Sequence, residues 1–343
     1  MSDKFEFNDD DNDLNDDHPD KQSEHLTMKP LIIYVKQSYS FSGFSIQTPC
    51  VSCESLATLV DLNNNPNNED FYNEQKKSLS ACPISIEIIM FLSLKQLPFD
   101  VKLCNPQKIL PEELRYGRHR HRMITGNQLL PVLVDQNNHN HLIEYHMDII
   151  DYIQKQYPSD DLDFHPDDDN LDNWKLFTTI NMVSRRFYHY VQQHYHQYHQ
   201  QSSQKKSTTS IPKQQLFCAL NKLDKMLISF GKTYAITDKQ PTMIDCHLMP
   251  RLHQIRVLLK QFDNGDDIPL IFNGIWKYLS ITYEWYIFCQ WCPSDQEIQI
   301  HWMMKSEYSR VKPREYRLKM IELIRSKPTY SFQDFPNVKD TKL

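Results

Sequence analysis

The sequence of 343 residues has no long apolar run. A membrane-spanning helix needs roughly 18 consecutive apolar residues, and the best candidate, residues 84–94, is interrupted by Glu87. The first residues also lack the basic and apolar regions of a secretory signal peptide. From these absences we expect a soluble protein of the cytoplasm.

The chain has little net charge outside one segment. Residues 1–28 contain ten acidic and two basic residues, a net charge of −8, which leaves +2 for the rest because the whole chain carries −6. The balance excludes the basic surface typical of nucleic-acid-binding proteins. The acidic segment has almost no apolar content, so we expect it to be a disordered tail.

Disulfides and a metal site are not indicated either. Eight cysteines in a chain of this length without a signal peptide are expected to be reduced thiols. The pairs Cys50/Cys53 and Cys289/Cys292 have the CxxC spacing of zinc ligands but lack the flanking pattern of a zinc knuckle. The histidines near residues 194–199 alternate with Tyr and Gln, without ligand-type partners. We therefore expect no metal.

The most informative segment begins at Cys82, which is followed directly by Pro83 and an apolar run with helical spacing. Proline suits the first position of a helix, where its missing N–H costs nothing. Cys82 would then lie beside the unpaired N–H groups and the positive end of the helix dipole. That environment favours a nucleophilic thiolate.

Strands are predicted on both sides of this helix, at residues 30–36 and 99–104. Residues 129–134 (LLPVLV) begin a third strand with a proline, where thioredoxin-like folds keep a cis-proline. We expect a thioredoxin-like domain over residues 29–157, with a surface insertion at 37–79.

Everything beyond the acidic linker 158–170 has helical patterns. We expect an all-helical domain over residues 171–305, with a low-complexity loop at 195–212. A variant of the capping box, Thr242 to Asp245, opens one of its long helices. Residues 306–343 are predicted to form an extension that is mostly tail. The fold class is α/β plus all-α.

This two-domain order resembles the glutathione-transferase architecture. Within it, residues 245–253 (DCHLMPRLH), 267–279 (DIP through GIWKYL) and 292–298 (CPSDQEI) resemble the chloride intracellular channel (CLIC) family. The resemblance implies two activities: a glutathione-dependent oxidoreductase, and anion (chloride) conduction by a form that inserts into membranes. Glutathione, anions and, conditionally, a membrane are the implied partners.

The resemblance also implies site residues. Cys82 takes the reactive-thiol position, and Ser85 replaces the second thiol found in many relatives. Ser85 can hydrogen-bond a thiolate but cannot close a disulfide, which leaves a monothiol route. Four residues are implied to contact glutathione at these positions: Lys36, Pro83, Leu130 and Pro131.

One position departs from glutathione-binding relatives, which place an acid followed by Ser or Thr at the start of the domain's last helix. Here Tyr145 and His146 fall there. His146 would meet the γ-glutamyl end without the usual acid–hydroxyl pair, so we expect weak glutathione affinity.

The residues leave three functions open. The first is a CLIC-like protein that associates with membranes and conducts anions. The second is a monothiol glutathione-dependent enzyme that uses Cys82. The third is a scaffold that keeps the transferase-like fold and has no chemistry.

Overall fold

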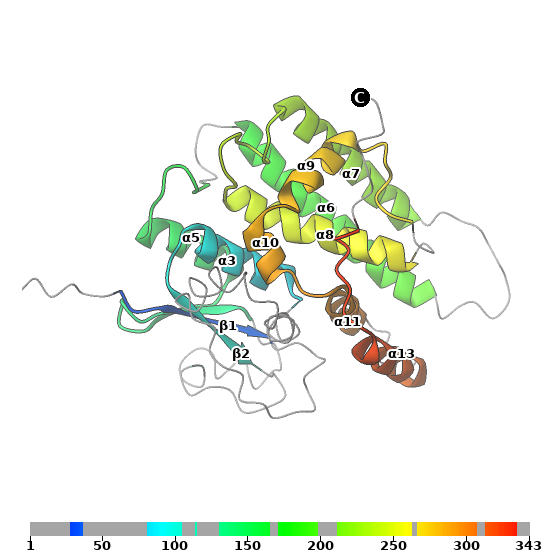
Figure 1. Ribbon diagram of the computed structural model, residues 1–343, viewed down its shortest axis with the longest axis horizontal. Helices are drawn as coiled ribbons and strands as arrows, with labels where there is room; N and C mark the ends of the chain where they lie inside the picture. Colours follow the sequence, from blue (N-terminus) through cyan, green and yellow to red (C-terminus); the bar gives the residue numbers. More distant parts are fainter. Residues whose placement is uncertain are drawn as a thin grey trace, which may run out of the picture.

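The computed structural model describes residues 28–36, 81–104, 114, 130–164, 171–197, 211–262, 266–306 and 313–334. The predicted acidic tail and nearly all of the predicted insertion lie outside the described residues. In Figure 1 the strands lie on one side of the molecule and the long helices on the other.

The sheet has four strands in the order β2-β1-β3-β4. They are β1 (Leu31–Lys36), β2 (Phe99–Cys104), β3 (Val132–Asp135) and β4 (His141–Ile143). β1 pairs in parallel with β2, and β3 pairs antiparallel with β1 and β4. A parallel pair needs a crossover connection, and α3 (Pro83–Leu94) supplies a helix within it.

Two of the described helices in the chain's first half lie beside the sheet: α3 and α5 (His146–Gln156), which contact each other. α3 is buried from Ser85 through Leu92. It is covered by the sheet on one side and by α8 (Met243–Phe262) on the other, as Figure 1 shows. This double burial explains why the helix is apolar almost all round.

The second half is helical, with α8 at its centre. The other described helices of this half are α6 (Leu171–Gln197), α7 (Ile211–Phe230), α9 (Asn273–Thr282), α10 (Tyr286–Trp291), α11 (Asp295–Lys305) and α13 (Pro313–Arg325). α6 and α11 contact α8, and α13 contacts α11. At the start of α8, Asp245 accepts hydrogen bonds from the backbone N–H and the hydroxyl of Thr242, at 2.8 and 3.0 Å. The predicted capping box therefore has its acidic half in place.

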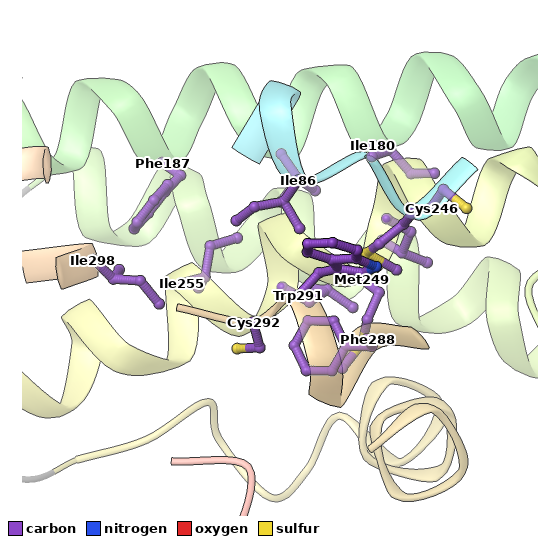
Figure 2. Packing of buried hydrophobic residues seen from close by; sticks show 14 of the residues in the cluster. Ile86, Ile180, Phe187, Cys246, Met249, Ile255, Phe288, Trp291, Cys292 and Ile298 are labelled. Carbon is purple, nitrogen blue, oxygen red and sulfur yellow. The ribbon is translucent and has the colours of Figure 1, made fainter. Parts of the chain in front are cut away.

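One apolar core joins the two halves. Figure 2 shows Ile86 of α3 among side chains from the helical half, including Met249 of α8 and Trp291 of α10. The indole N–H of Trp291 also donates to the Ser93 hydroxyl of α3 at 2.9 Å. Because α3 is embedded in this shared core, its N-terminus is held in a fixed place relative to both halves.

Helical structure extends further than the sequence predicted around the expected loop at 195–212. α6 continues to Gln197, and α7 begins at Ile211. His194 and Tyr195 explain the first extension, because both pack on Phe262 of α8, with ring centroids at 3.7 and 5.3 Å. Residues 198–210 lie outside the described residues.

The segment after α13 packs against the helical half as far as Asp334. The backbone N–H of Ser331 donates to Asp295 at 3.0 Å, and Arg256 donates to the Ser331 carbonyl at 3.1 Å. Phe332 packs near Tyr283 and Phe288. No periodic pattern predicts these contacts, because they depend on single residues that meet distant helices.

Among the described helices, none combines the length and the apolar character needed to cross a bilayer.

Candidate functional site

The thiol of Cys82 lies at the N-terminus of α3. Cys82 is the N-cap residue, with extended backbone angles (φ −70°, ψ 119°), and Pro83 is the first helical residue, as the sequence predicted. The Cys82 carbonyl accepts the first helical hydrogen bond, from the Ile86 N–H at 3.1 Å. The side chain is a half-buried thiol that is in no disulfide among the described cysteines. It therefore lies at the positive end of the helix dipole and remains partly accessible.

The expected cis-proline lies at the start of β3. The Leu130–Pro131 peptide bond is cis. The next residue, Val132, pairs with Tyr34 of β1. Continuing this register by one residue puts Pro131 beside the end of β1, close to Lys36.

Lys36 is the last residue of β1 and is half-buried. Burial and the positive charge of Lys305 lower the pKa of Lys36, whereas its interaction with Cys82 raises it. The three groups therefore share one electrostatic neighbourhood. Lys305 comes from the last turn of α11. Lys305 could not be predicted from the sequence, because no local pattern links the end of that helix to β1.

The helical half also holds the backbone immediately before the thiol. The Gln254 side chain of α8 donates to the Ala81 carbonyl at 2.8 Å, and its oxygen accepts from the Trp302 indole of α11 at 2.7 Å. All three residues are buried. A buried amide with both ends bonded is well fixed, so Gln254 sets the position of the residue that precedes Cys82.

Ser85, the second candidate for chemistry, lies one helical turn after Cys82. It is only 1% exposed, and its hydroxyl has no hydrogen-bond partner among the described residues. Such a buried unpaired hydroxyl is uncommon. A thiolate or a bound ligand at the start of the helix could pair with this hydroxyl. The role of Ser85 in the site stays a prediction.

A second polar cluster surrounds Glu87, also on α3. One carboxylate oxygen lies 2.8 Å from His146 Nε2 of α5 and 2.8 Å from His247 Nδ1 of α8. The other oxygen accepts from Arg251 of α8 at 2.7 Å. Glu87 is completely buried. We call these four residues the Glu87 cluster; it joins α3, α5 and α8.

Charge states in the Glu87 cluster follow from burial and from its neighbours. Burial would raise the pKa of Glu87, but Arg251, His247 and His146 together hold it well below its usual range. Burial and Arg251 lower the pKa of His247 to about 4, against the opposing effect of Glu87. At neutral pH, therefore, a charged Glu87 pairs with a charged Arg251 while His247 is neutral and donates a hydrogen bond.

The Glu87 cluster also bears on metal binding. The donor atoms of Glu87, His146 and His247 lie within 4.8 Å of one another, which a divalent ion could bridge. However, Arg251 already contacts the carboxylate. Its fixed positive charge opposes a second cation, so we interpret this group as a buried ion cluster.

His146, which the family resemblance implies as a glutathione contact, also has neighbours inside the protein. It begins α5, and its ring stacks with His247, at 6.1 Å between centroids and 5° between planes. Its Nε2 faces Glu87. Of the predicted site residues, Cys82 and Lys36 interact electrostatically, and Pro83 follows Cys82 at the start of α3. The strand register places the Leu130–Pro131 pair beside the end of β1, and His146 lies against Glu87.

Comparison with a solved structure identifies the fold. The crystal structure of the CLIC homologue EXC-4 from Caenorhabditis elegans matches 89% of this chain and 94% of its own, with a TM-score of 0.58 and 17% identity. The mixed four-stranded sheet followed by a helical domain is a glutathione-transferase-like fold, as the sequence predicted.

Sequence comparison identifies the relatives more narrowly. The chain is 35% identical over 113 residues to the chloride intracellular channel exl-1 of C. elegans, covering 33% of this chain and 45% of the relative. It is 36% identical over 83 residues to the chloride intracellular channel exc-4, covering 24% and 28%. The chain thus has homologues in the CLIC family, which confirms the resemblance, and spans less than half the length of these relatives. No protein-family model matches the chain.

Proposed function

We propose that this CLIC-related protein carries out monothiol, glutathione-dependent thiol–disulfide exchange at Cys82. The observation that carries the proposal is the half-buried thiol at the N-terminus of α3, with Lys36 in its electrostatic neighbourhood. A helix N-terminus and a nearby cation both favour the thiolate, which is the nucleophile in exchange.

The chemistry needs two steps. The Cys82 thiolate attacks the glutathione sulfur of a mixed disulfide, the substrate sulfur leaves as a thiolate and takes up a proton, and Cys82 becomes glutathionylated. A second glutathione thiolate then attacks the glutathione sulfur on Cys82, which releases the Cys82 thiolate and glutathione disulfide. Two electrons pass from glutathione to the substrate disulfide. With Ser85 one turn on, no second thiol is available there, and glutathione resolves the intermediate.

Glutathione would lie along the start of β3, where the backbone next to Pro131 can pair with an extended peptide as an added strand. Lys36 would meet a glutathione carboxylate. His146 faces Glu87, and Tyr145 is 43% exposed. The γ-glutamyl end would therefore lack its usual acid–hydroxyl partners, which supports weak binding.

The test is a coupled reductase assay with a glutathione mixed disulfide of a small thiol. We expect turnover by the wild type and by Cys289→Ser, which removes another half-buried thiol. We expect Cys82→Ser to fall to the uncatalysed rate. Equal rates for the wild type and Cys82→Ser would reject the enzyme and favour the scaffold.

A second candidate function is anion conduction by a membrane-associated form. It is favoured by the two sequence relatives, both of which are named chloride intracellular channels. Under this proposal the protein is cytoplasmic and associates conditionally with membranes. Chloride flux from liposomes, compared with flux caused by heat-denatured protein, tests it. Flux no greater than that of the denatured control would reject it.

A further inference from the structure

The last described helix, α13, has one face packed on the protein. It contacts α11 and lies at the edge of the molecule, as Figure 1 shows. Leu323 is 7% exposed, and Tyr316 and Met320 are partly buried against the core. At about 100° per residue these three side chains fall within one narrow sector of the helix.

A neighbouring face presents apolar side chains to the outside. Leu318, Ile321 and Ile324 are 61%, 45% and 43% exposed. They are spaced three residues apart, so they form a continuous stripe along the helix. Single exposed apolar residues need no explanation, but a stripe of three on one helix does.

Arginines lie on the same outward face. Arg314, Arg317 and Arg325 are all exposed. At 100° per residue each falls within the sector of the stripe or at its margin. The carboxylates of α13, Glu315 and Glu322, fall outside it, and Glu322 is paired with Lys319 at 3.2 Å. The outward face of α13 is thus apolar and cationic.

We propose that this face, which we call the α13 surface, binds the surface of a membrane that contains anionic phospholipid. A helix with exposed Leu and Ile among basic residues lies in the interface plane, with its apolar side chains inserted and its charges among the headgroups. Arginine suits phosphate because its planar fork donates two hydrogen bonds.

The arrangement favours a lipid surface over a protein groove. The arginines are interleaved with the apolar residues, so a closed groove would strip water from all of them and would need an acidic partner for each. At the headgroup level the arginines stay hydrated while their stems cover apolar surface. The inference deepens the membrane association proposed above, but it requires neither anion conduction nor chemistry at Cys82.

The test is co-sedimentation of the full chain with vesicles of phosphatidylcholine alone or mixed with phosphatidylserine. We expect binding to the mixed vesicles that falls as salt is raised, because exposed charges are screened. We expect Arg317→Gln and Arg325→Gln each to weaken binding about fivefold, because one basic residue near an anionic surface contributes about that much to binding. Ile321→Asp should weaken it more.

Matched controls lie on α9 and just before it. Ile271→Asp changes an apolar side chain that is 77% exposed, and Lys277→Gln removes an exposed cation. Both should bind vesicles as the wild type does, and circular dichroism with thermal unfolding checks that every variant is folded. Equal binding by α13 and control variants would overturn the proposal. So would a change only in oligomeric state, which would assign the α13 surface to self-association.

Discussion

Two polar features of α3 contrast sharply. Cys82 caps the helix and is half-buried, with its properties set mainly by the backbone around it. Glu87 lies inside the same helix, is completely buried, and has charged or polar partners on two other helices. The first arrangement rests mainly on a helix N-terminus, with Lys36 nearby and Gln254 holding the preceding residue. The second exists only when both halves of the protein are assembled. The candidate reactive thiol and the ion cluster that joins the two halves thus lie at different places on one helix.

The largest effect should come from breaking the Glu87 cluster. Arg251→Met leaves the buried carboxylate without its charged partner, and we expect a loss of about 3–5 kcal/mol in the free energy of unfolding. Denaturant titration measures it, with the exposed Arg185→Met as the control. A loss below about 1 kcal/mol would mean that Glu87 does not depend on Arg251.

Acid should destabilise the protein through its buried histidines. The pKa of His247 is about 4 in the folded protein, against 6.5 as its ordinary value, because of burial and Arg251. The unfolded chain therefore binds more protons as the pH falls from 6.5 toward 4. We expect about 2 kcal/mol of stability lost from His247 alone between about pH 7 and pH 5.

His253 acts in the same direction, because burial and Arg256 lower its pKa to about 3. Unfolding curves at several pH values measure the loss. His247→Gln should make the pH dependence shallower, whereas exposed His189→Gln should leave it unchanged. Constant stability from pH 7 to pH 5 would contradict these charge states.

A smaller effect is expected at the link between the helical half and the thiol. Gln254→Met removes both the donor to the Ala81 carbonyl and the acceptor for the Trp302 indole, without adding a buried charge. We expect a loss of about 1–2 kcal/mol in stability and a changed rate of Cys82 alkylation. If the melting temperature falls but the alkylation rate does not change, Gln254 has only a structural role.

The smallest effect concerns glutathione itself. Since His146 faces Glu87, we expect weak binding, with a dissociation constant for glutathione far above about 1 μM. A constant of about 1 μM corresponds to a binding free energy of roughly −8 kcal/mol. Isothermal calorimetry measures it, and Lys36→Gln should weaken it further. Low-micromolar binding would show that the γ-glutamyl end has partners that the account does not include.

The same contrast explains what could be predicted from the sequence. Cys82–Pro83, the proline that opens β3 and the Thr242–Asp245 cap are local signals, and the structure has each of them. Glu87 was visible only as an interruption in an apolar run. Its partner His247 lies 160 residues away, so no periodicity links them. Lys305 and the anchored segment up to Asp334 were missed for the same reason.

The most direct test of the central claim is a competition between two thiols of one protein. Cys218 on α7 is exposed, whereas Cys82 is half-buried. The native chain is treated at neutral pH with a limiting amount of iodoacetamide, and peptide mapping gives the rate at each cysteine. Activation by the α3 N-terminus predicts that Cys82 is alkylated faster than Cys218 despite its lower exposure. Faster alkylation of Cys218, with Cys82 slow or unreactive, would contradict the account.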